Sequence, residues 1–226
     1  FIKKPKSDIP DRNIRAFTLQ EERRFLSYLK HYTPVNTNFD NRFILIICLF
    51  SGMRAGEVCA LKYEDIDLKN NLIHVRRTMT RGIDYQNKLG NVTKTNCGRR
   101  DIPIDQKHLR PFLEQILKNY SKNPYDLLFY NKAKDSFCSA NSVNHAFKRI
   151  CESANIQVEG GVHILRHTFA TRCIEAGVRA ETLKGWLGHK DVSTTINTYV
   201  TVFQRLQDQQ MEQVESYNQR ELLCVG

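Results

Sequence analysis

The stretch Asp40-Asn-Arg-Phe-Ile-Leu-Ile-Ile-Cys-Leu-Phe-Ser51-Gly52 contains the longest apolar run of the chain, the eight residues from Phe43 to Phe50. A helix needs about 20 apolar residues to cross a bilayer, so this run is too short for a membrane anchor. It predicts instead a buried helix from Asp40 to Ser51, which Gly52 ends. The chain of 226 residues is long enough to enclose a core, and we expect one large domain with a small appendage.

Helical patterns continue on both sides of this stretch. Thr18-Leu-Gln-Glu21 is a capping box that predicts a helix start, and residues 54–61 predict a short helix after Gly52. Further helices are predicted over 109–120, 141–154, 163–176, 180–187, 191–200 and from about 203 towards 223. Strand signals at 72–75 and 101–104 flank turn-like residues 91–99 and predict a small antiparallel sheet, with Lys94 near a hairpin tip. The predicted fold class is mainly α with a small antiparallel β-sheet (α+β).

The charge balance favours a polyanionic partner. The chain has 34 Lys and Arg against 24 Asp and Glu, a formal net charge of +10. Residues 201–226 contain 2 basic and 4 acidic side chains, so residues 1–200 carry 32 minus 20, or +12. Nucleic acid is the commonest partner for so basic a body, although many basic proteins are simply soluble.

The cysteines and the first residues of the chain indicate the cellular compartment of the protein. The chain has seven cysteines, widely spaced and without a C-x-x-C pair, which argues against both a disulfide framework and a zinc cage. No secretory signal opens the sequence. Because the first residue is Phe1 rather than Met, we interpret the chain as a piece of a longer, cytoplasmic protein.

A set of polar side chains, scattered along the sequence, suggests the chemistry. The set is Arg54, Lys94, His163, Arg166, His189 and Tyr199. Guanidiniums suit the non-bridging oxygens of a phosphodiester, a phenol can attack phosphorus, and lysine and histidine can exchange protons with the entering and leaving oxygens. No acidic cluster accompanies them, so we predict no metal and no cofactor. The set predicts phosphoryl transfer through a phosphotyrosine, although each residue alone has a simpler interpretation.

The same residues lie in ordered motifs over about residues 18–199 that resemble the catalytic domain of the tyrosine recombinases, or phage-integrase family. The motifs are Ser51-Gly-Met-Arg54-Ala-Gly-Glu57, Thr93-Lys94-Thr95, His163-Ile-Leu-Arg166-His-Thr-Phe-Ala170, and Leu187-Gly-His189 followed by Tyr199. The interval from His189 to Tyr199 is ten residues, where the family usually has nine. This spacing looks like that of the integrases of conjugative transposons.

The resemblance implies a phosphate-binding role for three residues and a positioning role for a fourth. Arg54 and Arg166 are expected to bind the non-bridging oxygens, and His189 is expected to hydrogen-bond the phosphate. Glu57 lies one helical turn after Arg54 and is expected to orient either Arg54 or His163.

The resemblance also implies how protons and bonds move. Tyr199 is expected to attack the scissile phosphate and form a 3′-phosphotyrosyl bond, while Lys94 acts as the general acid for the leaving 5′-oxygen. His163 is expected to assist proton transfer to and from the tyrosine. Two other tyrosines, Tyr217 and Tyr120, fit the nucleophile position much less well.

The implied function is site-specific DNA recombination, for the integration and excision of a mobile element. A chromosome- or plasmid-resolving recombinase and a type IB topoisomerase are the alternatives. The expected partners are a double-stranded DNA recombination site, further copies of the chain in a tetrameric synapse, and an accessory excision factor, with no membrane partner. The expected location is the bacterial cytoplasm, at the nucleoid when bound to DNA. The DNA-contact candidates, for each of which a solvated surface role is equally reasonable, are Arg76, Arg77, Arg81, Lys88, Arg99, Arg100, Lys148, Arg149 and Lys184.

The expected organisation has three parts. Residues 1–17 are interpreted as a linker from missing N-terminal DNA-binding domains, residues 18–200 as the catalytic domain, and residues 201–226 as a C-terminal helical tail. The candidate apolar anchors of the tail are Phe203, Leu206, Met211, Val214 and Tyr217. The tail is expected either to dock on a neighbouring protomer or to cap its own domain.

Overall fold

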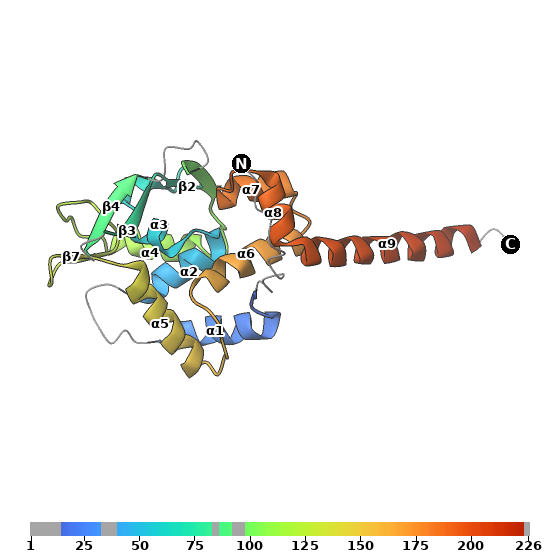
Figure 1. Cartoon of the computed structure of the whole chain (residues 1–226), viewed down its shortest axis with the longest axis horizontal. Helices are drawn as coiled ribbons and strands as arrows, with labels where there is room; N and C mark the ends of the chain where they lie inside the picture. Colours follow the sequence, from blue (N-terminus) through green and yellow to red (C-terminus); the bar gives the residue numbers. More distant parts are fainter. Residues whose placement is uncertain (1–14, 33–39, 83–85, 92–97, 224–226) are drawn as a thin grey trace, which may run out of the picture.

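A computed structural model describes residues 15–32, 40–82, 86–91 and 98–223 (Figure 1). The predicted hairpin tip with Lys94, and residues 1–14 of the predicted linker, lie outside the described residues. The described helices are α1 (Leu19–His31), α2 (Asn41–Ser51), α3 (Ala55–Cys59), α4 (Arg110–Lys118), α5 (Ala140–Ser153), α6 (His163–Glu175), α7 (Ala180–Leu187), α8 (Val192–Thr198) and α9 (Val200–Leu223). They follow the sequence predictions closely, and the mainly helical fold class with small antiparallel sheets is confirmed.

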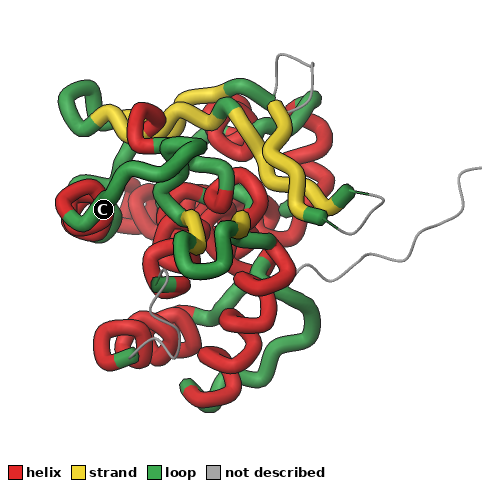
Figure 2. The backbone as a smooth tube through the Cα atoms, turned by 90° about the vertical axis from the view of Figure 1, so that its left-hand side faces the viewer, coloured by secondary structure: helices red, strands yellow, loops and turns green. Residues whose placement is uncertain are grey.

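The strands form separate small sheets. Strands β1 (Ile66–Asp67), β2 (Leu72–Val75) and β5 (Arg100–Pro103) make one antiparallel sheet in that order, while β3 (Arg77–Arg81) pairs with β4 (Asn87–Asn91) in a second. Figure 2 shows these longer strands gathered at one end of the helices. The single sheet predicted for this region is therefore divided, because the chain leaves the first sheet at Arg76, between β2 and β3. A further hairpin of β6 (Tyr130–Asn131) and β7 (Ser136–Phe137) was not predicted, since two-residue strands are too short for an alternating pattern.

Helix α2 lies at the centre of the core, where it packs against α3, α4, α5 and α6. Its residues Ile44, Leu45 and Ile47 are fully buried. Asp40 caps its start by accepting a hydrogen bond from the backbone N–H of Arg42 at 2.9 Å. The buried helix predicted from the longest apolar run is thus the central helix of the fold.

Gly52 ends α2 in a left-handed conformation, with φ of 66°, and its N–H donates to the carbonyl of Cys48 at 3.1 Å. A Cβ atom at this position would lie 2.4 Å from the ring of Phe169. Both the positive φ and the close ring require glycine here. The turn directs the chain from the buried helix towards Arg54 and the start of α3.

The folded domain begins slightly before the predicted boundary at residue 18. Phe17 is 2% exposed, and its ring lies 5.3 Å from that of Phe25 and 6.1 Å from that of Phe147. Its backbone N–H donates to the hydroxyl of Thr168 at 2.9 Å. Phe17, which the sequence analysis assigned to the linker, therefore belongs to the core.

The last helix leaves the body of the molecule. Val202, Phe203 and Leu206 pack against a small apolar cluster of α6 and α7, after which α9 projects away from the domain (Figure 1). Among the described residues, no helix combines the length and the apolar character needed to span a bilayer.

Candidate active site

Arg54 lies directly after the turn at Gly52 and is the residue that precedes α3. Its backbone N–H donates to Glu57 Oε2 at 2.8 Å, and its Nη1 donates to Glu57 Oε1 at 3.1 Å. The Arg54 side chain is nevertheless 44% exposed. Arg54 therefore presents a charged fork to solvent while one of its nitrogens is held by Glu57.

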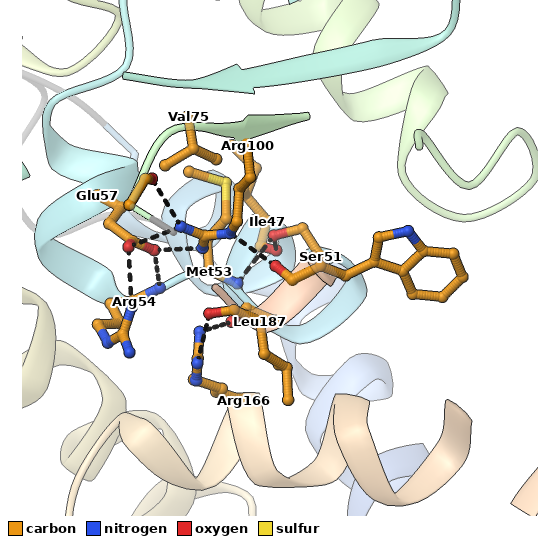
Figure 3. Close-up of polar contacts among 12 residues, drawn as sticks. Ile47, Ser51, Met53, Arg54, Glu57, Val75, Arg100, Arg166 and Leu187 are labelled. Carbon is orange, nitrogen blue, oxygen red and sulfur yellow. Dashed lines mark hydrogen bonds and ion pairs between the residues drawn. The ribbon is translucent and has the colours of Figure 1, made fainter. Parts of the chain in front are cut away.

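Glu57 is buried and is also bound by a second arginine. It is 4% exposed, and Arg100 grips both of its oxygens, with Nη1 at 3.0 Å from Oε1 and Nη2 at 2.7 Å from Oε2 (Figure 3). Burial raises the pKa of Glu57, but the hydrogen bonds and charge of Arg100, together with Arg54, lower it to about 2. Glu57 is therefore an anion at neutral pH, shared between two guanidiniums.

Arg100 was predicted as a DNA contact, and the structure places it differently. Its side chain is 6% exposed, and its Nε donates to the backbone carbonyl of Trp186, near the end of α7, at 2.7 Å. With Glu57 bound at both Nη atoms, the guanidinium faces the protein interior. The sequence could not distinguish it from its neighbour Arg99, which is exposed, because the two residues have the same side chain.

Arg166 lies on α6 and is 2% exposed. Its Nη1 donates to the carbonyl of Gly52 at 2.8 Å and its Nη2 to the carbonyl of Leu187 at 2.7 Å (Figure 3). These carbonyls lie at the C-terminal ends of α2 and α7, where the helix dipoles favour a cation. Burial and the nearby charge of Arg54 lower the pKa of Arg166 to about 9, so it remains charged at neutral pH.

Two imidazoles lie in the field of both arginines. His163 is the first residue of α6, and its pKa is lowered by partial burial and by the charges of Arg166 and Arg54. His189 follows the end of α7, with its Nδ1 2.8 Å from Thr195 Oγ1. Burial and the same two charges lower the pKa of His189 to about 4. Both rings are therefore mainly neutral at pH 7.

Tyr199 lies between α8 and α9 and is 2% exposed. Its hydroxyl lies 3.0 Å from Nδ1 of His167, and burial raises its pKa to about 12 although the charge of Arg166 opposes this. Burial and the neighbouring His163 lower the pKa of His167 to about 4. The phenol is therefore protonated, and it forms a hydrogen bond with a neutral imidazole. The apolar residues packed around Tyr199 are Ala170, Ile174, Leu183 and Leu187.

His167 is not among the site residues predicted from the sequence. The signal was present, because His163 and His167 are four residues apart and so share one face of α6. Their rings are 5.3 Å apart, nearly perpendicular, and the rings of His167 and Tyr199 are 5.9 Å apart. His167 thus connects the exposed His163 with the buried tyrosine.

The structure separates the two other tyrosines from this site. The hydroxyl of Tyr120 donates to Asp126 at 3.3 Å, and Tyr217 is 64% exposed on the projecting part of α9. Lys94 lies outside the described residues.

The other basic residues predicted to touch DNA differ in their surroundings. Arg76 and Arg77 are engaged in ion pairs of the protein, with Asp101 at 2.6 Å and Asp65 at 2.7 Å respectively. The exposed candidates are Arg81, Lys88, Arg99, Lys148 and Arg149, and Lys184 is half-buried. Over the described ranges, no group of three or more His, Cys, Asp or Glu side chains is arranged to hold a metal ion.

Comparison with known proteins gives a consistent family match. The sequence model of the Phage integrase family matches residues 15–205. The tyrosine recombinase XerA of Thermococcus kodakarensis is 32% identical over 203 residues, covering 89% of this chain and 63% of the relative. The transposase from transposon Tn916 of Enterococcus faecalis is 26% identical over 196 residues, covering 81% of this chain and 47% of the relative. The chain thus spans between about half and two thirds of these relatives.

Solved structures show the same fold. The Tn1549 transposon integrase in complex with circular intermediate DNA superposes with a TM-score of 0.71 at 25% identity, over 81% of this chain and 62% of that one. The catalytic domain of bacteriophage HP1 integrase superposes with a TM-score of 0.55 at 20% identity, over 91% of this chain and 96% of that one. The second likeness concerns the fold alone.

Proposed function

The chain belongs to the phage integrase family, and we propose that it is a site-specific DNA recombinase that cuts and rejoins DNA through a covalent phosphotyrosine. One observation carries the proposal. Arg166 donates to the carbonyl of Gly52, two residues before Arg54, and to the carbonyl of Leu187, two residues before His189, and the adjacent His167 lies 3.0 Å from the hydroxyl of Tyr199. Residues from four parts of the sequence therefore share one electrostatic site that is suited to a phosphodiester.

In this proposal the two arginines bind the non-bridging oxygens of the scissile phosphate. Arg54 has an exposed guanidinium, and Arg166 is fixed by the carbonyls of Gly52 and Leu187. Donors that are oriented before the reaction stabilise the charge of the pentacoordinate state, each by about 2.7–4 kcal/mol. His189 adds a further hydrogen bond to the phosphate.

The hydroxyl of Tyr199 then attacks phosphorus. The bond from the phenolic oxygen to phosphorus forms as the bond from phosphorus to the 5′-oxygen breaks, leaving a 3′-phosphotyrosyl link. The 5′-oxygen takes a proton from Lys94, and the phenol proton passes to an imidazole, either the predicted His163 or its neighbour His167. Because Tyr199 is 2% exposed, it reaches the phosphate only when the junction of α8 and α9 moves.

Rejoining reverses these steps. A 5′-hydroxyl of a second DNA end attacks the phosphotyrosine, forms a new phosphodiester and releases Tyr199. The covalent link preserves the bond energy, so neither ATP nor a metal ion is needed. Recombination rather than hydrolysis is therefore the proposed outcome.

The proposed biological reaction is the integration and excision of a mobile element. The ten-residue interval between His189 and Tyr199 favours this reaction, and the similar proteins include a transposon transposase. They also include the tyrosine recombinase XerA, and resolution of chromosomes or plasmids is the second candidate. A type IB topoisomerase would relax a supercoiled plasmid without joining two sites, so an assay that scores both products separates it from a recombinase.

The proposed partners are double-stranded DNA, further copies of the chain in a tetrameric synapse, and an accessory excision factor, at the nucleoid of a bacterial cell. The distal part of α9 is suited to contact another copy, because Met211, Val214 and Tyr217 are exposed on a helix that projects from the body. Its first turns pack in cis instead. Residues preceding the folded domain are proposed as the linker to DNA-binding domains.

The test of this function is covalent capture. The chain is incubated with a nicked half-site DNA, whose short 5′-fragment diffuses away after cleavage, and a protein–DNA adduct is sought on a denaturing gel. We expect an adduct with the wild-type chain and with Tyr120→Phe, and none with Tyr199→Phe. An adduct with Tyr199→Phe would contradict the assigned nucleophile, and no adduct with the wild type on its own target would contradict the function.

A further inference from the structure

Arg100 makes an unusually complete set of contacts for an arginine beside a reactive site. Both oxygens of Glu57 accept from it, at 3.0 and 2.7 Å, and the carbonyl of Trp186 accepts from its Nε at 2.7 Å. All three guanidinium nitrogens are therefore engaged, and the side chain is 6% exposed. These contacts leave the guanidinium without an open side for a DNA phosphate.

The contacts join three elements that each carry part of the proposed site. Arg100 begins β5, and Trp186 is the penultimate residue of α7. Glu57 lies on α3, the helix that begins at the residue after Arg54. The next carbonyl of α7, that of Leu187, accepts from Arg166. Two arginines thus bind consecutive carbonyls at one helix end, where the dipole favours cations, and together they fix the end of α7 that precedes His189.

Arg54 depends on this arrangement. Within the described part of the chain, the Arg54 side chain contacts Glu57 at 3.1 Å, and it is 44% exposed. A long exposed arginine samples many rotamers unless a partner restrains it. Glu57 can restrain it only while its own carboxylate is fixed, and the two-pronged grip of Arg100 fixes both oxygens.

We propose that Arg100 is a positioning residue for DNA cleavage: it orients Glu57, and Glu57 holds Arg54 in place for the scissile phosphate. The inference rests on the proposed function. A buried ion pair is weak grounds for stability, because the cost of removing both charges from water offsets their attraction. Orientation of a catalytic donor is a better reason for this pair, since a misplacement of about 1 Å in an active site can slow a reaction roughly 100-fold.

The experiment compares Arg100→Gln and Arg100→Lys with Arg110→Gln. Arg110 is a suitable control because it also joins distant parts of the chain, donating to Asn71 at 2.6 Å and Glu114 at 2.7 Å, away from the site. The rate of adduct formation is measured in a single turnover at saturating DNA. We expect Arg100→Gln to be slowed roughly 100-fold with unchanged half-saturation by DNA, Arg100→Lys to be slowed less because it keeps one contact, and Arg110→Gln to match the wild type.

A second substrate distinguishes positioning from a general loss of structure. A methylphosphonate at the scissile position replaces one charged oxygen by a methyl group, which removes much of the need for Arg54. If Arg100 acts through Arg54, the ratio of wild-type to Arg100→Gln rates falls towards one on this substrate. Equal slowing on both substrates, or no slowing on the natural phosphate, would overturn the proposal.

A measurement without DNA keeps the two proposals separable. Phenylglyoxal modifies exposed guanidiniums, and mass spectrometry can follow its reaction at Arg54. We expect faster modification of Arg54 in Arg100→Gln and in Arg100→Lys than in the wild type or Arg110→Gln, whether or not the chain cuts DNA. Unchanged reactivity at Arg54 would refute the positioning role, while failure of the wild type to form an adduct would refute only the proposed function.

Discussion

The proposed phosphate-binding side of the site and the side that holds the proposed nucleophile are built differently. On the first side, Arg166 is fixed by two backbone carbonyls, and Glu57 is fixed by Arg100. On the second side, the hydroxyl of Tyr199 is hydrogen-bonded to His167 within an apolar cluster. In the proposed site, the groups that would stabilise charge are therefore oriented before DNA binds, whereas the proposed nucleophile is protonated and buried.

This difference would keep the proposed site from cleaving DNA until the phenol moves. Preorganised donors lower the barrier of the reaction without reorganisation at the moment of attack. In the proposed mechanism these donors alone do not cleave DNA, because the phosphodiester breaks only when the phenol approaches phosphorus. The proposed nucleophile lies at the junction of α8 and α9, so the movement that the proposal requires would involve a small part of the fold.

The largest effect is expected on the phosphate-binding side. Arg54→Ala and Arg166→Ala should each slow adduct formation by about 10²–10³-fold, the usual cost of removing one charge-stabilising donor. Only Arg166→Ala should also reduce the free energy of unfolding, because it leaves buried carbonyls without donors, at about 1–3 kcal/mol each. Single-turnover kinetics and urea unfolding of both variants measure the two effects. Equal stability of the two variants would mean that Arg166 is not the fixed member of the pair.

A smaller effect is expected where Tyr199 is stored. His167→Leu leaves the buried hydroxyl without a partner and should lower the free energy of unfolding by about 1–3 kcal/mol. Adding Tyr199→Phe removes that hydroxyl, so the double variant should recover much of the loss. Urea unfolding of the four proteins gives the coupling energy, expected at about 0.5–3 kcal/mol. Additive single effects would show that this hydrogen bond does not stabilise the resting state.

The two histidines and Glu57 should affect stability in different ranges of pH. The pKa of His167 and of His189 is about 4 when folded, below the 6.5 of a free histidine, so the unfolded chain binds more protons below pH 6.5. The free energy of unfolding should therefore be full above about pH 6.5 and fall as the pH drops towards 4. The pKa of Glu57, about 2 against 4.5, acts only between about pH 4.5 and 2. Urea midpoints at pH 7.5, 5 and 3 test this.

A histidine variant tests whether titration of His167 contributes to the loss of stability between pH 6.5 and 4. His167→Leu should reduce the fall in the free energy of unfolding between pH 6.5 and 4, leaving the share of His189, and should not change the lower range, that of Glu57. The imidazoles of His167 and His189 are both partly accessible to water, so solvent screening reduces the size of the effect on stability. A wild-type profile that stays level from pH 6.5 to 4 would contradict the proposed protonation states.

The smallest effect on stability is expected beyond the nucleophile, in α9. Removal of residues 210–226 should change the free energy of unfolding by no more than about 0.5 kcal/mol, because Met211, Val214 and Tyr217 are exposed. Removal of residues 202–226 should be clearly destabilising, since it deletes Phe203 and Leu206 from the cluster around Tyr199. Sedimentation of the shorter truncation on DNA tests docking in trans, and unchanged assembly would exclude it.

Much of the fold could be predicted because its signals are local. The apolar run from Phe43 to Phe50, the cap at Asp40 and the stop at Gly52 predicted α2, and strand β2 and helix α7 have the predicted bounds. Caps, periodicity and turn residues act over a few positions, so they are legible in one sequence. The residues of the proposed site were also named, since ordered motifs resemble a known family.

What the sequence by itself determined was therefore the kinds of residues available and the elements that carry them. Only the tertiary structure decided that Arg100 faces Glu57 and the carbonyl of Trp186, which are 43 and 86 positions away, and that its neighbour Arg99 faces solvent. It likewise selected His167 as the partner of Tyr199, at a separation of 32 positions. The physical reason is that side chains with the same chemistry acquire different roles from packing and burial, and contacts between distant segments leave no local pattern to read.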